Sequence, residues 1–185
     1  GNQRVRVVAA RSGTFYGQPM RAGHIYSVAG NGTAGFSGDG GPATSAELQY
    51  PHGVAVDAAG NILIADAGNQ RVRVVAARSG TFYGQAMTAG DIYTIAGDGS
   101  AGFAGDGGPA TSAELNDPIG LAVDAAGNVV IADEFNQVVR VVAGSNGTFY
   151  GRAMTAGDIY SIAGALYPQG VAGDAAGNVL IADTS

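Results

Sequence analysis

The chain has 185 residues, 46% of them hydrophobic, which is enough for the core of one globular domain spanning residues 1–185. It contains no cysteine, so neither a disulfide framework nor a thiolate zinc site can form. All nine basic residues are arginine, against 15 acids and a formal net charge of −6. An acidic surface repels phosphate, so we expect no nucleic-acid partner. No apolar run approaches the roughly 20 residues that span a bilayer, so no membrane insertion is expected.

The chain consists of three copies of one module. Residues 51–97 recur, shifted by 67 residues, as residues 118–164. The second half of the module precedes them at residues 1–30, and its first half follows them at residues 168–185. A chain that begins inside a module is expected of a fragment, a processed product or an engineered repeat rather than of a complete gene product.

Each complete module contains four short apolar runs, which in the first module lie at 53–56, 62–65, 72–76 and 92–96. The runs are rich in Val and Ile and are bounded by Gly, Asp or Asn, so they predict strands rather than helices. The links after the first two runs, DAAGN and DAGN, have the composition of tight turns.

The third link of the module is longer and predicts an extended hairpin at residues 78–90. Aromatic residues that recur in every copy would form a sticky patch if exposed, so we expect Phe82, Tyr83 and Met87 to fold back over the sheet.

Connectors of twenty residues precede both complete modules, at residues 31–50 and 98–117. In the first connector, residues 39–42 are typical of a turn, and residues 42–48 could form a short helix with proline near its first turn. Only Ala165, Leu166 and Tyr167 stand before the last module, so seventeen connector residues are missing there.

Each module therefore predicts a four-stranded antiparallel sheet that cannot bury both of its apolar faces alone. Repeats of about 40–50 residues with four strands are the blades of β-propellers. The sequence predicts an all-β fold built of stacked blades.

The segments GVAVDAAGNILIADAGNQRVRVV, GLAVDAAGNVVIADEFNQVVRVV and GVAGDAAGNVLIAD resemble the NHL repeat. The text between the blades, AGxGxAGFxGDGGPATSAEL, resembles bacterial NHL-repeat proteins as well. This resemblance implies a propeller, best known with six blades, and a tendency to bind proteins, peptides or nucleic acid. It does not imply one activity, because function depends on sites that differ between proteins of one fold.

The two ends of the chain read as halves of one split blade. Residues 181–185 continue into residues 1–4 as residues 64–71 continue within one module, with one residue to spare. Residues 168–185 are then the inner two strands and residues 1–30 the outer two. Three blades are too few to close a ring, and an open arc would expose two apolar faces. We therefore expect a homodimer with six blades, in which each chain completes the split blade of the other.

Two repeated sets of aspartates could be imagined as metal ligands in the channel, namely Asp57, Asp124 and Asp174, and Asp66, Asp133 and Asp183. An aspartate at a strand end more simply accepts backbone N–H bonds, and we expect Asp66, Asn69 and Arg71 to tie adjacent strands together. The GDGGPA connectors resemble neither a calcium loop nor a phosphate loop. No cofactor or metal is expected.

Catalysis is not expected either. His24 and His52 are the two histidines, and aspartate replaces His24 in the sister copies. There is no cysteine nucleophile and no Ser-His-Asp spacing. NHL-like enzymes such as amidating lyases use a histidine-rich metal centre, which two histidines do not supply.

Positions that the fold requires should repeat, whereas positions that contact a ligand can differ between copies. The copies differ at the start of the innermost strand and in the turn after the second strand. These positions form the candidate binding set: Tyr50, His52, Asp117, Ile119, Glu134, Phe135, Tyr167 and Gln169. Neutral drift in loops would produce the same differences.

The sequence therefore favours a non-catalytic binding or scaffold module that recognises a protein, a peptide or a small ligand at the propeller mouth. A structural repeat that self-assembles is the alternative. A metal-dependent propeller enzyme is a further one.

Overall fold

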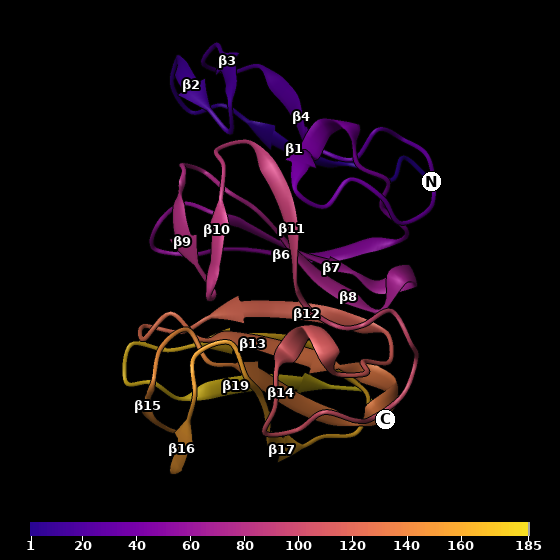
Figure 1. Ribbon diagram of the computed structural model, residues 1–185, viewed down its shortest axis with the longest axis vertical. Coiled ribbons are helices and arrows are strands. Elements are labelled where there is room, and N and C mark those ends of the chain that lie inside the picture. Colours follow the sequence, from indigo (N-terminus) through magenta and orange to yellow (C-terminus); the bar gives the residue numbers. More distant parts are fainter. Residues whose placement is uncertain (185) are drawn as a thin grey trace.

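The computed structural model describes residues 1–184. Strands and short 3-10 helices are the regular elements of these residues. The predicted all-β class is confirmed, and the sheets stack as a propeller-like series (Figure 1).

The N-terminal part is a two-stranded sheet in which β1 (Val5–Val8) pairs antiparallel with β4 (Ile25–Ala29). Between them stands a separate hairpin of β2 (Gly13–Phe15) and β3 (Gln18–Met20). We call the β1–β4 pair the N-terminal half-blade. Its inner side packs on the next sheet, because Val5, Val28 and Ala29 share a buried cluster with Ile62 and Ile64.

The first complete blade is a sheet with the strand order β5-β11-β8-β7-β6. Its elements are β5 (Gly41–Pro42), β6 (Pro51–Val56), β7 (Ile62–Asp66), η2 (Ala67–Asn69), β8 (Arg71–Val75) and β11 (Asp91–Ala96), with a hairpin of β9 (Gly80–Phe82) and β10 (Gln85–Met87). All residues of β7 are buried, because this strand is covered by sheets on both sides.

The second complete blade has the strand order β12-β13-β14-β17. Its elements are β12 (Pro118–Val123), β13 (Val129–Asp133), η4 (Glu134–Asn136), β14 (Val138–Val142) and β17 (Ile159–Gly164), with a hairpin of β15 (Gly147–Phe149) and β16 (Arg152–Met154). The C-terminal half-blade, β18 (Pro168–Gly173) paired with β19 (Val179–Asp183), packs on this blade.

The connectors contain 3-10 turns instead of the short helix considered for residues 42–48. They are η1 (Ala43–Ser45) and η3 (Ala110–Ser112). Pro42 stands directly before η1, as predicted, but the turn stops at Ala46, whose backbone is already extended at φ −69° and ψ 152°.

The predicted tight turn after the inner strand is confirmed. The Oδ1 atom of Asp57 accepts hydrogen bonds from the N–H groups of Ala59 and Asn61, both at 2.9 Å. Asp124 and Asp174 make the same bonds in their own copies. These three aspartates therefore hold the turns of the fold.

The predicted aromatic cover is confirmed as well. Met87 is 4% exposed, and Phe82 and Tyr83 pack against the same buried cluster. The hydroxyl of Tyr83 donates to Oδ2 of Asp57 at 2.8 Å, so the β9–β10 hairpin is fastened to the first turn of its own blade.

The innermost strands of successive blades lie side by side in the order β6, β12, β18. They approach each other at glycine. A Cβ atom on Gly120 would stand 2.7 Å from the carbonyl oxygen of Gln169, and one on Gly53 would meet the carbonyl oxygen of Ile119. This spacing brings the starts of the three inner strands together at one end of the blades.

Candidate binding site at the channel mouth

The starts of β6, β12 and β18, together with η2 and η4, form one end of the blade stack, which we call the channel mouth. The turn after the second strand is bonded to the residues before the first. The N–H of Gly68 in η2 donates to the carbonyl of Gln49, and the N–H of Phe135 in η4 donates to the carbonyl of Asn116. The two segments of each complete blade that differ between copies, the start of the inner strand and the turn after the second strand, therefore lie at this end.

The residue before each inner strand has a left-handed backbone, with φ of 49° at Tyr50, 55° at Asp117 and 48° at Tyr167. This conformation is uncommon for a residue other than glycine and needs support from its surroundings. Glutamines of the preceding copy supply it. Gln3 Oε1 accepts from the N–H of Tyr50 at 2.8 Å, and Gln70 Oε1 accepts from that of Asp117 at 2.6 Å.

These glutamines were not singled out from the sequence, although their recurrence in the GNQRV segment is a visible signal. They fix the backbone from which the side chains of Tyr50 and Asp117 project. The mouth is thus preorganised by the neighbouring copy.

An open depression of about 400 Å³ lies between the inner strands at this end. It is lined by His52, Gly53, Ile119, Gly120, Leu121, Gln169 and Val171. Three members of the candidate set, one from each inner strand, therefore face the same depression.

Two acidic members of the set lie close together beside these residues. Burial raises the pKa of Asp117, and the neighbouring Glu134 raises it further, while His52 opposes the shift. Glu134 is only 9% exposed, and its Oε1 accepts a hydrogen bond of 3.0 Å from Nε2 of Gln169. The structure thus brings His52, Asp117, Glu134 and Gln169 into one cluster.

The three aromatic members lie outside the lining of the depression. Tyr50 is 61% exposed, Phe135 57% and Tyr167 42%. Each stands at the mouth end of its own blade, and we call these three residues the aromatic rim.

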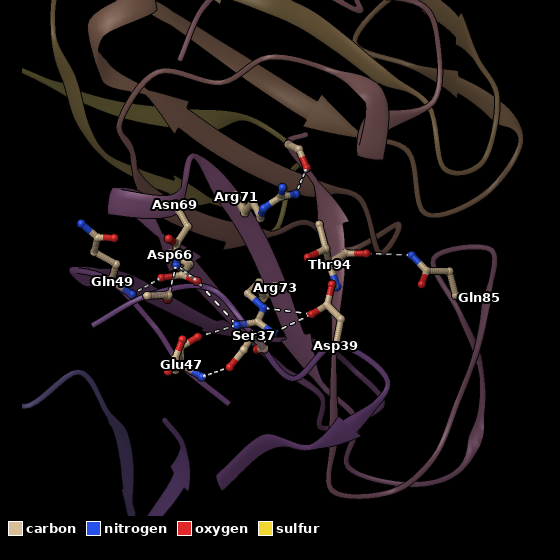
Figure 2. Close-up of polar contacts among 12 residues, drawn as sticks. Ser37, Asp39, Glu47, Gln49, Asp66, Asn69, Arg71, Arg73, Gln85 and Thr94 are labelled. Atoms are coloured by element: carbon tan, nitrogen blue, oxygen red, sulfur yellow. Dashed lines mark hydrogen bonds and ion pairs between the residues drawn. The ribbon is translucent and has the colours of Figure 1, made fainter. Parts of the chain in front are cut away.

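Asp66 and Arg71 were both expected to tie adjacent strands together, but their side chains do not bond to each other. Arg71 donates instead to the carbonyl oxygens of Gly97 and Asp98. Arg73, two residues further along β8, forms the ion pair, with 3.7 Å between Nη1 and Oδ2 of Asp66 (Figure 2). The predicted bond from Asn69 to Asp66 is present at 2.8 Å.

Arg73 is fully buried and ties the connector to the blade. It forms a 2.6 Å ion pair with Asp39 and donates to the carbonyls of Ser37 and Glu47 (Figure 2). Arg140 repeats these contacts in the second blade with Asp106 and Asp133. Asp66 and Asp133 therefore have a structural role.

Among residues 1–184, no three or more His, Cys, Asp or Glu side chains come close enough together to hold a metal ion. No helix in this part of the chain is long and apolar enough to cross a membrane.

Residues 48–75 match the model of the NHL repeat, which confirms the repeat type recognised from the sequence. No curated protein matches the chain. A solved structure from Bacteroides thetaiotaomicron, described as a structural genomics protein of unknown function, superposes with a TM-score of 0.55 at 16% identity. The match covers 88% of this chain but 37% of the other, so the chain spans little more than a third of that relative.

A second solved structure, an auxiliary nutrient binding protein from the same organism, superposes with a TM-score of 0.44 at 19% identity, covering 63% of this chain and 27% of the other. At such identities the first likeness speaks for the fold alone. The chain thus contains one segment that matches the NHL repeat, residues 48–75, within a propeller-like arrangement of sheets.

Proposed function

We propose that the protein is a non-catalytic binding module that holds a cationic ligand, such as a basic peptide segment, at its channel mouth. The observation that carries this proposal is the placement of Asp117 beside Glu134 in partly buried surroundings at the edge of an open depression. Two carboxylates that lie together out of water repel each other, and a bound cation relieves that repulsion.

The aromatic rim supports the same ligand class. The faces of Tyr50, Phe135 and Tyr167 are available to solvent, and aromatic faces attract ammonium and guanidinium groups. The net charge of −6 favours the encounter with a basic partner over longer distances.

We propose no catalytic step at this site. None of the residues that line the depression offers a hydroxyl or a thiol as nucleophile. A binding role, unlike a catalytic one, requires only a fixed shape, complementary charge and exposed apolar surface.

The test is a calorimetric titration of the 185-residue chain with two blocked decapeptides, (Gly-Lys)5 and (Gly-Glu)5. We expect binding of the lysine peptide alone. The double variant Asp117→Asn/Glu134→Gln should weaken that binding at least about tenfold, because both charges that face the ligand are removed.

The matched control is Asp91→Asn/Asp158→Asn, which removes the same charge at the opposite ends of the two blades, where β11 begins and β17 is about to begin. It should bind the lysine peptide as the parent does. Equal losses in the two double variants would show that net charge alone attracts the peptide, and the proposed site would be wrong.

A further inference from the structure

The two ends of the blade stack expose apolar positions that are buried in both complete blades. On the second strand of a blade, Leu63 and Val130 are fully buried, whereas Leu180 is 54% exposed. The whole of β13 is buried, yet β19, with nearly the same residues, is exposed or half-buried throughout. Among the strands of residues 1–184, β19 pairs with β18 alone, so its other edge is open.

The N-terminal half-blade shows the complementary exposure on the third and fourth strands. Val8 is 62% exposed and Ile25 55%. Their counterparts in both complete blades are fully buried: Val75 and Val142 for Val8, and Ile92 and Ile159 for Ile25. Each half-blade lacks the strands that the other possesses.

The two charged residues that form a buried ion pair in a complete blade are also separated between the two half-blades. In the first complete blade, Asp66 at the end of β7 and Arg73 on β8 are fully buried and form an ion pair. The equivalent aspartate is Asp183 on β19 and the equivalent arginine is Arg6 on β1, and both are exposed. Within residues 1–184 neither of them forms an ion pair.

A tyrosine and its acceptor are separated as well. Tyr83 donates to Asp57 and Tyr150 to Asp124, each within its own blade. The third tyrosine, Tyr16, donates instead to the carbonyl of Gly60 in the next blade at 3.1 Å. The aspartate equivalent to its expected acceptor is Asp174, which lies in the C-terminal half-blade.

The close approach of inner strands is interrupted at the last blade. Gly120 faces the carbonyl of Gln169, but a Cβ on Gly170 would touch nothing except the side chain of Ala182, at 3.4 Å. By equivalence of the copies, the carbonyl missing opposite Gly170 is that of His52. On the same strand as His52, Val54 is 54% and Val56 59% exposed.

We propose that a second copy of this chain supplies each missing half. Strand β1 of one copy pairs antiparallel with β19 of the other, and β18 of that copy packs on β6 of the first, so that two copies close a ring. The register is that of the complete blades, where Ile64 pairs with Arg73 and Ala65 with Val72. Ile181 then lies opposite Arg6, and Ala182 opposite Val5.

Within residues 1–184 the two half-blades do not meet, because they lie toward opposite ends of the long axis (Figure 1). The partner is a second copy rather than an arbitrary strand, because the two ends match each other in apolar residues, charge and hydroxyl position. The match is incomplete at one point: the short connector before Pro168 leaves Arg6 without a counterpart of Asp39, so Asp183 is its one ionic partner in the ring.

The first test uses the absence of cysteine from the chain. In the double variant Val5→Cys/Ala182→Cys, the two thiols of the joint lie on different copies directly opposite each other. We expect mild oxidation to give a disulfide-linked dimer of about twice the 18.3 kDa chain mass. Each single variant lacks the opposing thiol at the joint, so it should remain unlinked.

The register control is Val8→Cys/Ala182→Cys. This pair is displaced by three residues, about 10 Å along the strands, beyond the reach of a disulfide. Equal cross-linking of both double variants would contradict the register, and a failure of the first to cross-link would overturn the proposal.

The second test is the mass of the unmodified chain by light scattering. We expect twice 18.3 kDa, and either a stable monomer or a ladder of longer assemblies would overturn ring closure. The variant Arg6→Ala should raise the dissociation constant at least about tenfold with an unchanged circular dichroism spectrum, because the arginine is exposed in the single chain. Arg21→Ala, another exposed arginine of the same half-blade, should leave the constant unchanged.

Discussion

Arg73 and Arg140 are the two largest fully buried side chains between residues 1 and 184. Taking a guanidinium out of water is costly unless its charge and its donors are all matched. Here each guanidinium meets two aspartates and two backbone carbonyls, so the connector before a blade becomes part of the blade itself.

Replacing Arg73 with methionine should therefore destabilise the chain by about 3–5 kcal/mol, because Asp66 would be left buried without its partner. Urea unfolding measures the change. The control is Arg21→Met, which alters an exposed arginine and should change the unfolding free energy by less than about 0.5 kcal/mol. Similar effects of the two variants would show that the buried ion pair does not hold the connector.

Asp117 should make the opposite contribution to stability. Its pKa is raised by burial and by Glu134, so the folded chain binds the proton more tightly than the unfolded chain. The unfolding free energy then falls as pH rises from 3.8, the ordinary value, through the raised pKa of the folded chain.

Asp117→Asn should thus be more stable than the parent at pH 7 and equal to it at pH 3, while it binds the lysine peptide more weakly. Thermal unfolding at the two pH values gives the first quantity and calorimetry the second. A variant that is less stable at pH 7 would indicate that the carboxylate serves the fold, as Asp57 does.

Much of this residue-scale detail is beyond prediction from the sequence. Strand register places Arg71 directly opposite Asp66, so pairing the two was reasonable. Arg71 instead donates hydrogen bonds to the carbonyl oxygens of Gly97 and Asp98, which come from another part of the chain. The candidate set at the mouth was found because copies differ, and its role in binding stays a prediction.

At the scale of elements, composition predicts more. The apolar run 92–96 corresponds to β11 (Asp91–Ala96) and the run 62–65 to β7 (Ile62–Asp66), since Gly, Asp and Asn mark the strand ends clearly. The helix considered at residues 42–48 shrinks to a 3-10 turn because the chain must turn extended again at Ala46, whose N–H bonds back to Ala43.

The aromatic hairpin offers a test at this scale. Burial and the neighbouring Asp57 raise the pKa of the Tyr83 hydroxyl, so this group remains a donor even at alkaline pH. Tyr83→Phe should cost about 1.5–3 kcal/mol in unfolding free energy, the range for a hydrogen bond to a charged group. Tyr150→Phe should repeat this cost through Asp124, and Tyr50→Phe at the exposed rim should cost nothing measurable.

At the scale of the whole molecule, three copies in one sequence predict stacking but not the spacing of the stack. That spacing is set by glycine on the inner strands, where a side chain would collide with the next strand. Gly120→Ala should destabilise the chain by about 1–3 kcal/mol, because its Cβ would stand 2.7 Å from the carbonyl oxygen of Gln169. Urea unfolding of the single variant measures this cost.

The variant Gly170→Ala distinguishes folding of a single chain from closure of a ring by two chains. The same methyl group has open space at Gly170, where only Ala182 lies within 4 Å, so unfolding of the single chain should be unchanged. In a closed ring the carbonyl of His52 from the second copy lies where Gln169 lies opposite Gly120, and the methyl group would force the inner strands apart. We expect the variant to keep its strand-rich circular dichroism spectrum and to scatter light as a monomer. If it remained a dimer with the affinity of the parent chain, the inner strands of two copies would not meet at Gly170, and the ring would have to close by the β1–β19 pairing alone.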